Sequence, residues 1–355
     1  MRVLHCLIFE SVHYLLSFSL FALSLWSFRS GGWISFAPMV YSFGCIPLFE
    51  LFLRPNKKNL NPDQKEYRAS DKFYDRLLYL VVPLHFSCLG VFLYTVWSHP
   101  EAEGLTYWGW VSSMGILNGV FGINVAHELG HRPGKKEQFL AQFLLLSSLY
   151  MHFFIEHNRG HHRYVATRED PATARKWEPV YVFWLRSTIG SWLQAWELEF
   201  DRLKRKKIGK WSIHNQMVRF TAVQLLFCLG IFWLGGQAVG VAFLLSAGFG
   251  IMLLETVNYI EHYGLMRSRV SELRYEKVMP WHSWNSNHRV GRWMLFELSR
   301  HSDHHHRPAR RYQLLEHHPH SRQLPTGYPG MMLVSLLPPL FFGLIHPRLN
   351  APVHS

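Results

Sequence analysis

Long apolar blocks alternate with polar segments along the 355-residue chain, and the length of each block limits what it can form. A helix needs about 20 mainly apolar residues to cross the hydrocarbon core of a membrane. Six blocks meet this requirement and predict six transmembrane helices, at about 4–27, 33–53, 77–98, 105–130, 216–235 and 237–262. We therefore expect an all-α integral membrane protein with one domain over residues 1–355.

Three further apolar stretches are less suited to crossing a membrane. Residues 180–196 are rich in aromatic side chains but contain Arg186, which is typical of a helix that lies in the membrane interface. Residues 331–345 are short and contain the pair Pro338-Pro339. Residues 139–155 are almost long enough to cross, and the histidines on either side of them decide their placement.

Positive charge is distributed unevenly between the apolar blocks. Seven, fifteen and twelve Lys or Arg residues fall in three long polar parts, at 54–76, 132–214 and 263–355. The three short turns at the other ends of the blocks contain only Arg29. Positively charged loops remain on the cytoplasmic side. We therefore expect both termini and three polar parts to be cytoplasmic, at 54–76, 131–215 and 263–355.

The formal net charge of +13 is also typical of proteins that bind nucleic acid. Here the basic residues lie between apolar blocks, which favours cationic loops at a membrane and no nucleic-acid partner. The basic run from Arg202 to Lys207 suits anionic membrane lipid or, alternatively, an acidic electron carrier. The four cysteines lie singly in apolar blocks, so any iron–sulfur electron source must be a separate protein.

Eight histidines form three clusters in or beside the predicted cytoplasmic parts. Their spacings are H-x3-H, H-x3-H-H and H-x2-H-H, and the clusters are His127 and His131; His157, His161 and His162; and His301, His304 and His305. Residues three or four apart share one face of a helix, so each cluster can direct its imidazoles toward one point. Neutral imidazole suits iron, copper, zinc or nickel, whereas calcium and magnesium prefer oxygen. The clusters therefore predict a transition-metal site.

A polar stripe near the end of the sixth predicted helix adds a further histidine. Glu255, Asn258 and His262 lie at i, i+3 and i+7, and the fourth helix repeats the pattern with Asn124, His127 and His131. Ionisable residues inside a membrane-spanning segment are functional candidates. We expect these two stripes to contribute to one site just beneath the cytoplasmic surface.

The distance between two clusters constrains residues 139–155. His131 and His157 are 26 residues apart, so a straight spanning helix between them would separate them by about 39 Å. They could not then share a metal centre. We therefore predict that residues 139–155 lie in the interface or pack under the bundle.

The motif His127-Glu-Leu-Gly-His131 is also typical of zinc proteases, in which Glu128 would be the general base. That interpretation leaves the other clusters unexplained. The three-cluster spacing instead resembles the membrane fatty-acid desaturase and hydroxylase superfamily. Within it, four segments resemble the membrane alkane 1-monooxygenases: HELGHR at 127–132, EHNRGHHRYVATREDPATAR at 156–175, NYIEHYGL at 258–265 and RHSDHHHRPARRYQ at 300–313.

The resemblance implies nine iron ligands, which are His127, His131, His157, His161, His162, His262, His301, His304 and His305. It implies two non-haem iron ions that use O2 to convert linear alkanes to 1-alkanols. It also implies a rubredoxin-type electron donor with an NAD(P)H-dependent reductase. The expected location is the bacterial inner membrane, with the metal site on the cytoplasmic side.

Ligand imidazoles usually donate their second N–H to a carboxylate or a carbonyl. Carboxylates near the clusters are therefore candidates to support the ligands, and these are Glu128, Glu156, Asp170, Glu255, Glu261 and Asp303; Asn258 lies on the same stripe as Glu255. A membrane fatty-acyl desaturase or hydroxylase with the same metal core is the nearest alternative function. A metal transporter would need polar residues through the middle of the membrane, and the first, second, third and fifth blocks offer few.

Overall fold

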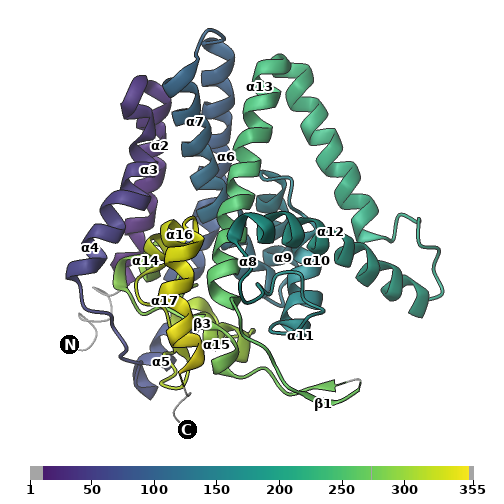
Figure 1. Cartoon of the computed structure of the whole chain (residues 1–355). Coiled ribbons are helices and arrows are strands. Elements are labelled where there is room, and N and C mark those ends of the chain that lie inside the picture. The colour runs from purple at the N-terminus through teal and green to yellow at the C-terminus, as the bar shows by residue number, and fades with distance from the viewer. Residues whose placement is uncertain (1–10, 273, 352–355) are drawn as a thin grey trace.

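The computed structural model describes residues 11–272 and 274–351 and consists mostly of helices (Figure 1). Long helices stand side by side in one half of the molecule, and shorter helices and loops gather in the other half. The first predicted block contains η1 (His13–Phe18) and α2 (Ser19–Arg29), and its residues 4–10 lie outside the described part. The second block contains η2 (Gly32–Phe36), α3 (Ala37–Val40), η3 (Tyr41–Cys45) and α4 (Ile46–Phe52).

The remaining apolar blocks form helices that differ in their continuity. The third block is the single helix α6 (Phe73–Ser98), which follows the short α5 (Pro62–Ser70). The fourth block is α7 (Gly104–Leu117), the π-helical η4 (Asn118–Ile123) and α8 (Asn124–Gly130). The fifth and sixth blocks together form α13 (Gln216–His262).

Helix α13 is bent sharply at Gly236, where φ is 79° and the backbone is not helical. Glycine adopts this left-handed conformation without steric cost, whereas other residues rarely do. The bend divides α13 into two arms that diverge from the top of the molecule (Figure 1). The predicted division of this region into the blocks 216–235 and 237–262 is therefore confirmed.

Three helical stretches of the described chain are long and apolar enough to cross a membrane, at Gly32–Phe52, Phe73–Ser98 and Gln216–His262. They contain the second, third, fifth and sixth predicted blocks. Six separate spanning helices are thus not confirmed within the described residues. The fourth block is not among the three, although α7, η4 and α8 follow one another without a break from Gly104 to Gly130.

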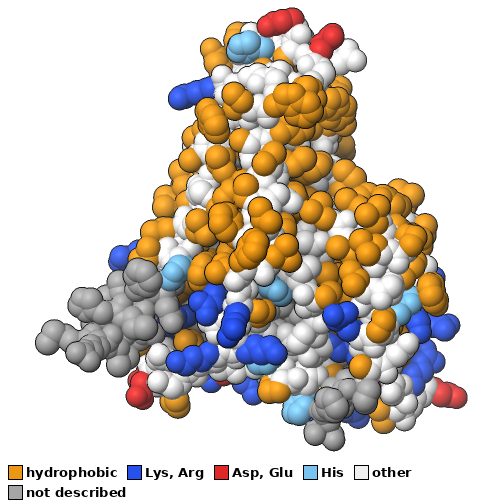
Figure 2. All heavy atoms as spheres, turned by 60° about the vertical axis from the view of Figure 1, so that its left-hand side comes forward, with side chains coloured by type: hydrophobic (Ala, Val, Ile, Leu, Met, Phe, Trp, Pro, Cys, Tyr) orange, Lys and Arg blue, Asp and Glu red, His pale blue; other side chains and the backbone are white. Residues whose placement is uncertain are grey.

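The surface of the molecule is divided by polarity. Hydrophobic side chains cover the tall part, and Lys and Arg gather around the base (Figure 2). Several of these apolar side chains are almost fully exposed, including Trp233 at 84% and Phe52 at 80%. An apolar surface that covers the whole tall part of the molecule is unfavourable in water and suits contact with lipid. The protein is an integral membrane protein.

Residues 139–155 do not form one straight helix. Helix α9 (Lys135–Leu146) ends in a turn that contains Leu149 at φ 52°, and α10 (Phe153–Glu156) follows. The π-helical η5 (His157–His161) and the short α11 (His162–Tyr164) continue from α10. The chain therefore returns to the end of α8, and His157 lies close to His131. This confirms the prediction that residues 139–155 do not form a straight spanning helix.

Helix α12 (Val180–Arg205) extends the predicted interfacial helix by about two turns. Tyr181, Leu185 and Ile189 are exposed on one side, and Phe183 and Ser187 are buried on the other. This pattern is the one expected of a helix that lies in an interface.

The C-terminal part contains short elements around α15 (His301–His306). Four short strands depart from the all-α prediction: β1 (Arg269–Ser271) pairs antiparallel with β2 (Arg274–Tyr275), and β3 (Trp284–Asn285) pairs parallel with β4 (Arg322–Gln323). The other elements are η6 (Pro280–His282), α14 (Arg289–Met294), η7 (Tyr312–Leu314), α16 (Tyr328–Ser335) and α17 (Pro338–Asn350). The apolar stretch 331–345 is interrupted at Pro338-Pro339, where α17 begins.

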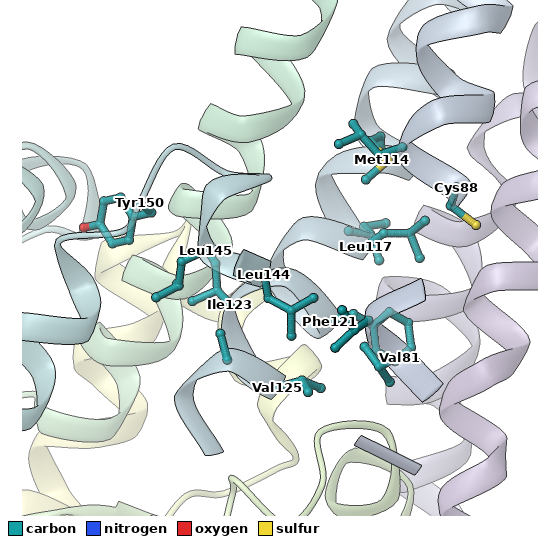
Figure 3. Packing of buried hydrophobic residues seen from close by; sticks show 14 of the residues in the cluster. Val81, Cys88, Met114, Leu117, Phe121, Ile123, Val125, Leu144, Leu145 and Tyr150 are labelled. Carbon is teal, nitrogen blue, oxygen red and sulfur yellow. The ribbon is translucent and has the colours of Figure 1, made fainter. Parts of the chain in front are cut away.

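The main apolar core packs around the fourth block, which ends at the first histidine cluster (Figure 3). Val81 of α6, Leu117 of α7, Phe121 of η4 and Leu144 of α9 are all buried in it. The ring of Phe121 also stacks on that of Phe21 at a centroid distance of 4.1 Å. This packing holds the fourth block in place and so positions α8 with its histidines.

Candidate metal centre

All nine predicted histidines meet in the interior of the molecule and form two groups. The five-histidine group is His127, His131, His157, His162 and His304. The four-histidine group is His161, His262, His301 and His305. Within each group the potential ligand atoms lie within 4.8 Å of one another. Each group brings together residues from distant parts of the chain.

The five-histidine group is linked by a series of four short contacts between Nε2 atoms. His127 Nε2 lies 3.0 Å from His304 Nε2, and His304 Nε2 lies 3.1 Å from His162 Nε2. His162 Nε2 is 3.0 Å from His157 Nε2, which in turn is 3.1 Å from His131 Nε2. All five rings therefore direct the same atom toward one centre.

The four-histidine group lies beside the first. His301 Nε2 is 3.0 Å from His262 Nε2, and His161 Nε2 is 3.2 Å from His305 Nε2. His304 and His305 are adjacent in α15 but belong to different groups, as do His161 and His162. The two groups thus share sequence clusters and are neighbours in space.

The π-helical turn η5 determines which histidines of the second cluster act together. In a π-helix the hydrogen bonds run from i to i+5, so residues five apart return to the same side. His157 and His162, which are five apart, both belong to the five-histidine group. His161, which regular α-helical spacing would pair with His157, belongs to the four-histidine group.

The chemistry of these rings fits transition-metal ions. Burial, followed by repulsion from neighbouring rings, lowers the pKa of His157, His304 and His305 well below the usual histidine range. The rings are therefore neutral, which is the form that binds a metal. Two nitrogens bound at right angles to one ion at about 2.1 Å lie about 3.0 Å apart, and the observed separations match this value.

Two carboxylates lie against rings of the four-histidine group. Asp170 Oδ2 lies 3.0 Å from His161 Nδ1, and Asp170 also accepts a hydrogen bond from Thr173 Oγ1 at 2.6 Å. Glu261 Oε1 lies 3.2 Å from His301 Nδ1, but neither atom makes a hydrogen bond among the described residues. The contact with Asp170 fixes the orientation of the His161 ring and the nitrogen that carries its proton.

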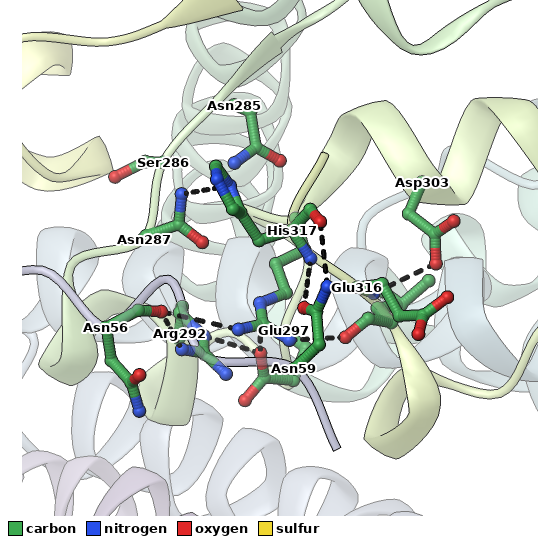
Figure 4. A network of polar contacts seen from close by, with 12 residues as sticks. Asn56, Asn59, Asn285, Ser286, Asn287, Arg292, Glu297, Asp303, Glu316 and His317 are labelled. Atoms are coloured by element: carbon green, nitrogen blue, oxygen red, sulfur yellow. Dashed lines mark hydrogen bonds and ion pairs between the residues drawn. The ribbon is translucent and has the colours of Figure 1, made fainter. Parts of the chain in front are cut away.

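The other candidate carboxylates contact different partners. Glu128 accepts from Arg132 and from the amide of Tyr312, and Glu255 accepts from Tyr150 at 2.9 Å. Asp303 binds His318 Nε2 at 2.7 Å, Arg310 and the amide of Glu316, as Figure 4 shows for Glu316. Glu156 is buried, and its Oε1 has no hydrogen-bond partner among the described residues. These four residues shape the surroundings of the histidines, and in the described structure none of them is hydrogen-bonded to a ring of either group.

An apolar cavity of about 80 Å³ ends at the histidines. His127 and His157 of the five-histidine group and His301 of the four-histidine group line it. Away from them the walls are almost entirely apolar and come from several elements, with Leu20, Phe43, Ile46, Ile116, Val120, Leu253, Leu254, Val257, Met294, Leu295, Leu298, Pro329 and Met332. Both groups of imidazoles therefore face one narrow apolar space.

Sequence reasoning did not anticipate the C-terminal wall of this cavity. Met294 is the last residue of α14 and Leu295 follows it, and Pro329 and Met332 belong to α16, which is far too short to be recognised as a membrane helix. No periodic signal in these segments indicates that they line a cavity. By contrast Asn258, predicted on the stripe with His262, does line it.

Comparison with known proteins agrees with this site. The Fatty acid desaturase family profile matches residues 105–334. The chain is 37% identical to an alkane 1-monooxygenase of Ectopseudomonas oleovorans over 328 residues, 92% of this chain and 81% of the relative. It is 38% identical to alkane 1-monooxygenase 2 of Pseudomonas aeruginosa over 313 residues, 87% and 82% of the two chains. It is 29% identical to the XylM hydroxylase component of xylene/toluene monooxygenase of Pseudomonas putida over 288 residues, 81% and 76% of the two chains. Because these matches cover most of both chains, the protein belongs to the alkane 1-monooxygenases, within the fatty acid desaturase family.

Proposed function

We propose that the protein hydroxylates the terminal methyl group of linear alkanes to give 1-alkanols, using O2 at a pair of iron ions. The observation that carries this proposal is the apolar cavity whose end is formed by histidines of both groups. A substrate without charge or polar groups needs such a cavity. The relatives named alkane 1-monooxygenase support the same substrate class.

The nine histidines are the proposed iron ligands. The five-histidine group would hold one iron and the four-histidine group the other. When bound, the irons would supply the activation of O2, a redox chemistry that amino-acid side chains cannot provide. Asp170 would hold the ring of His161 in the ligating orientation.

The cavity would bind the alkane and set which carbon reacts. Its walls exclude water, so burial of the chain is favourable. A narrow cavity admits the chain end first, which presents the terminal methyl group to the histidine end. Secondary C–H bonds are intrinsically weaker, so terminal selectivity has to come from this steric restriction.

The proposed topology has six spanning helices and places the iron site on the cytoplasmic side of a bacterial inner membrane, in one domain. The uneven distribution of Lys and Arg between the polar parts supports this orientation. The first block is helical over its described residues, and the fourth is helical throughout despite its π segment. We therefore include the first and the fourth block among the six proposed spanning helices.

Electrons would come from a rubredoxin-type protein that an NAD(P)H-dependent reductase keeps reduced. The three described cysteines are free and lie apart in different helices, so the described chain contains no cysteine set for an iron–sulfur centre. A separate donor is then required for each turnover.

The decisive experiment combines metal analysis with product identification. Purified protein in lipid nanodiscs would be supplied with NADH, a rubredoxin, its reductase and dodecane, and the products analysed by mass spectrometry. We expect two irons per chain and 1-dodecanol as the product. Formation of alkenes or hydroxy acids from acyl substrates, with none from dodecane, would instead support the desaturase or acyl-hydroxylase alternative.

A further inference from the structure

A second hollow, separate from the histidine site, lies beside the last turn of α4. It has a volume of about 420 Å³. The apolar side chains of Leu51 and Phe52 and the cationic side chains of Arg54 and Lys57 line it, together with segments at 287–288 and 323–326. Leu51 is 72% exposed and Phe52 80% exposed, so this cleft opens beside the lipid-facing surface.

Glu50 is the buried acid of this cleft. Its side chain is 2% exposed, and its Oε1 accepts a hydrogen bond of 2.7 Å from the amide of Gly291. Its Oε2 has no hydrogen-bond partner among the described residues. A Cβ at Gly327 would lie 1.8 Å from Oε2, so only glycine leaves room for the carboxylate at this position.

Asn287 adds a second acceptor to the same cleft. It is also 2% exposed, and its Nδ2 donates to Gln323 Oε1 at 2.7 Å and contacts His317 Nδ1 (Figure 4). Its Oδ1 has no hydrogen-bond partner in the described part of the chain. Buried acceptors are almost always paired because an unpaired one costs free energy. A ligand with N–H donors in this cleft would satisfy both acceptors.

The chemistry of the cleft selects among ligands. The carboxylate and the amide oxygen require a group with N–H donors, and a cation is favoured. Arg54 and Lys57 require an anionic group, and the exposed apolar side chains require a hydrocarbon chain. A zwitterionic phospholipid with a primary ammonium group contains all three parts.

We propose that this cleft binds a phospholipid of the phosphatidylethanolamine class. The ammonium group would donate to Glu50 Oε2 and Asn287 Oδ1, the phosphate would pair with Arg54 and Lys57, and an acyl chain would lie along Phe52. Gly291, which Glu50 holds, also lines the apolar cavity at the histidines. The bound lipid would therefore brace one wall of the substrate cavity.

Native mass spectrometry of the detergent-purified, delipidated full chain tests the proposal. Phosphatidylethanolamine, phosphatidylcholine and phosphatidylglycerol with identical acyl chains would be added separately, and the retained lipid counted. Phosphatidylcholine has the same phosphate but a quaternary nitrogen without N–H. We expect phosphatidylethanolamine to be retained about tenfold more strongly than phosphatidylcholine. Equal retention of the two, or a preference for phosphatidylglycerol, would overturn the proposal.

The variant Glu50→Gln locates the effect. Glutamine still offers an oxygen to the Gly291 amide but removes the charge and the free carboxylate oxygen. We expect the preference for phosphatidylethanolamine to disappear while retention of phosphatidylcholine is unchanged. Glu66→Gln, at an exposed position of α5, is the matched control and should keep the preference. A preference that survives in Glu50→Gln would contradict the assignment of Glu50, and the comparison of headgroups on the unmodified chain needs no variant.

Discussion

His162 Nε2 lies 3.0 Å from His157 Nε2, whereas His161, one residue earlier, contacts His305 in the other group at 3.2 Å. Because the turn η5 that begins at His157 is π-helical, the adjacent residues His161 and His162 belong to different histidine groups. This division allows each proposed iron to be perturbed separately.

His161→Ala and His162→Ala should each disturb a different iron. Removal of a ligand opens one coordination position and weakens binding of that ion, so we expect hydroxylation to fall by about 100-fold or more in both variants. Mössbauer spectra of the iron-loaded protein would show loss or broadening of one ferrous signal in the first variant and of the other signal in the second. His306→Ala, in the same helix as His304 but outside both groups, should keep both signals. If both variants lost the same signal, the division into five and four would be wrong.

Asp170→Asn should loosen the four-histidine group without removing a ligand. The carboxylate that contacts His161 Nδ1 is replaced by an amide, which can donate to the ring nitrogen and so favour the wrong tautomer. We expect iron to be released to a chelator about 10- to 100-fold faster. Asp303→Asn is the comparison, because the Asp303 carboxylate binds His318, which belongs to neither group. Equal release rates in the unmodified protein and Asp170→Asn would contradict the supporting role of Asp170.

Gly119→Val should fill part of the apolar cavity. Gly119 lines the cavity, and a Cβ at this position would already approach Leu253 Cδ1 to 3.1 Å. We expect iron content to be retained and dodecane hydroxylation to fall, with an overpacking cost of about 1–3 kcal/mol in unfolding free energy. Gly248→Val is the matched control, because a Cβ at Gly248 meets nothing within 4 Å. Unchanged activity of Gly119→Val on dodecane would show that the substrate does not occupy this space.

Glu199 should make the stability of the protein depend on pH. It is fully buried and accepts hydrogen bonds from Arg159, Arg202 and the amide of Gln216, which join η5, α12 and the start of α13. Burial alone would raise the pKa of Glu199, but these hydrogen bonds outweigh it and lower the pKa below the usual 4.5. The stabilisation is therefore complete above pH 4.5 and is lost as the pH falls through the lowered value.

Thermal unfolding of the unmodified protein and of Glu199→Gln measures this effect. At pH 7 the variant should be less stable by about 2 kcal/mol, because the buried arginine contacts lose their charged partner. The difference should shrink as the pH is lowered through the folded-state pKa. A difference that is the same at pH 7 and in acid would show that the charge of Glu199 contributes nothing.

The sequence predicted the members of the site better than their arrangement. Histidine spacing and the 26-residue separation of His131 from His157 were sufficient to predict that the clusters converge. The division into two groups was not predictable, because a π-helical turn leaves no mark in the spacing and regular α-helical spacing pairs His157 with His161. The same kind of segment, η4, interrupts the fourth apolar block, which hydropathy alone shows as continuous.

Proximity in sequence was a poor guide to the supporting carboxylates. Asp303 is adjacent to His304, yet its side chain turns to His318 and Arg310. Asp170 is nine residues from His161 and contacts it, because the loop after α11 folds back onto η5. Such contacts depend on loop conformation, for which apolar periodicity contains no information.

Helix α15 contributes His304 to the five-histidine group and His301 and His305 to the four-histidine group. The five-histidine group is therefore incomplete until the ribosome has passed His304, and the four-histidine group until it has passed His305, after all the predicted spanning segments have been synthesised. If the nine histidines are the proposed iron ligands, a chain that ends before α15 would lack ligands of both irons. Both proposed centres would then assemble only after the predicted spanning segments have been synthesised.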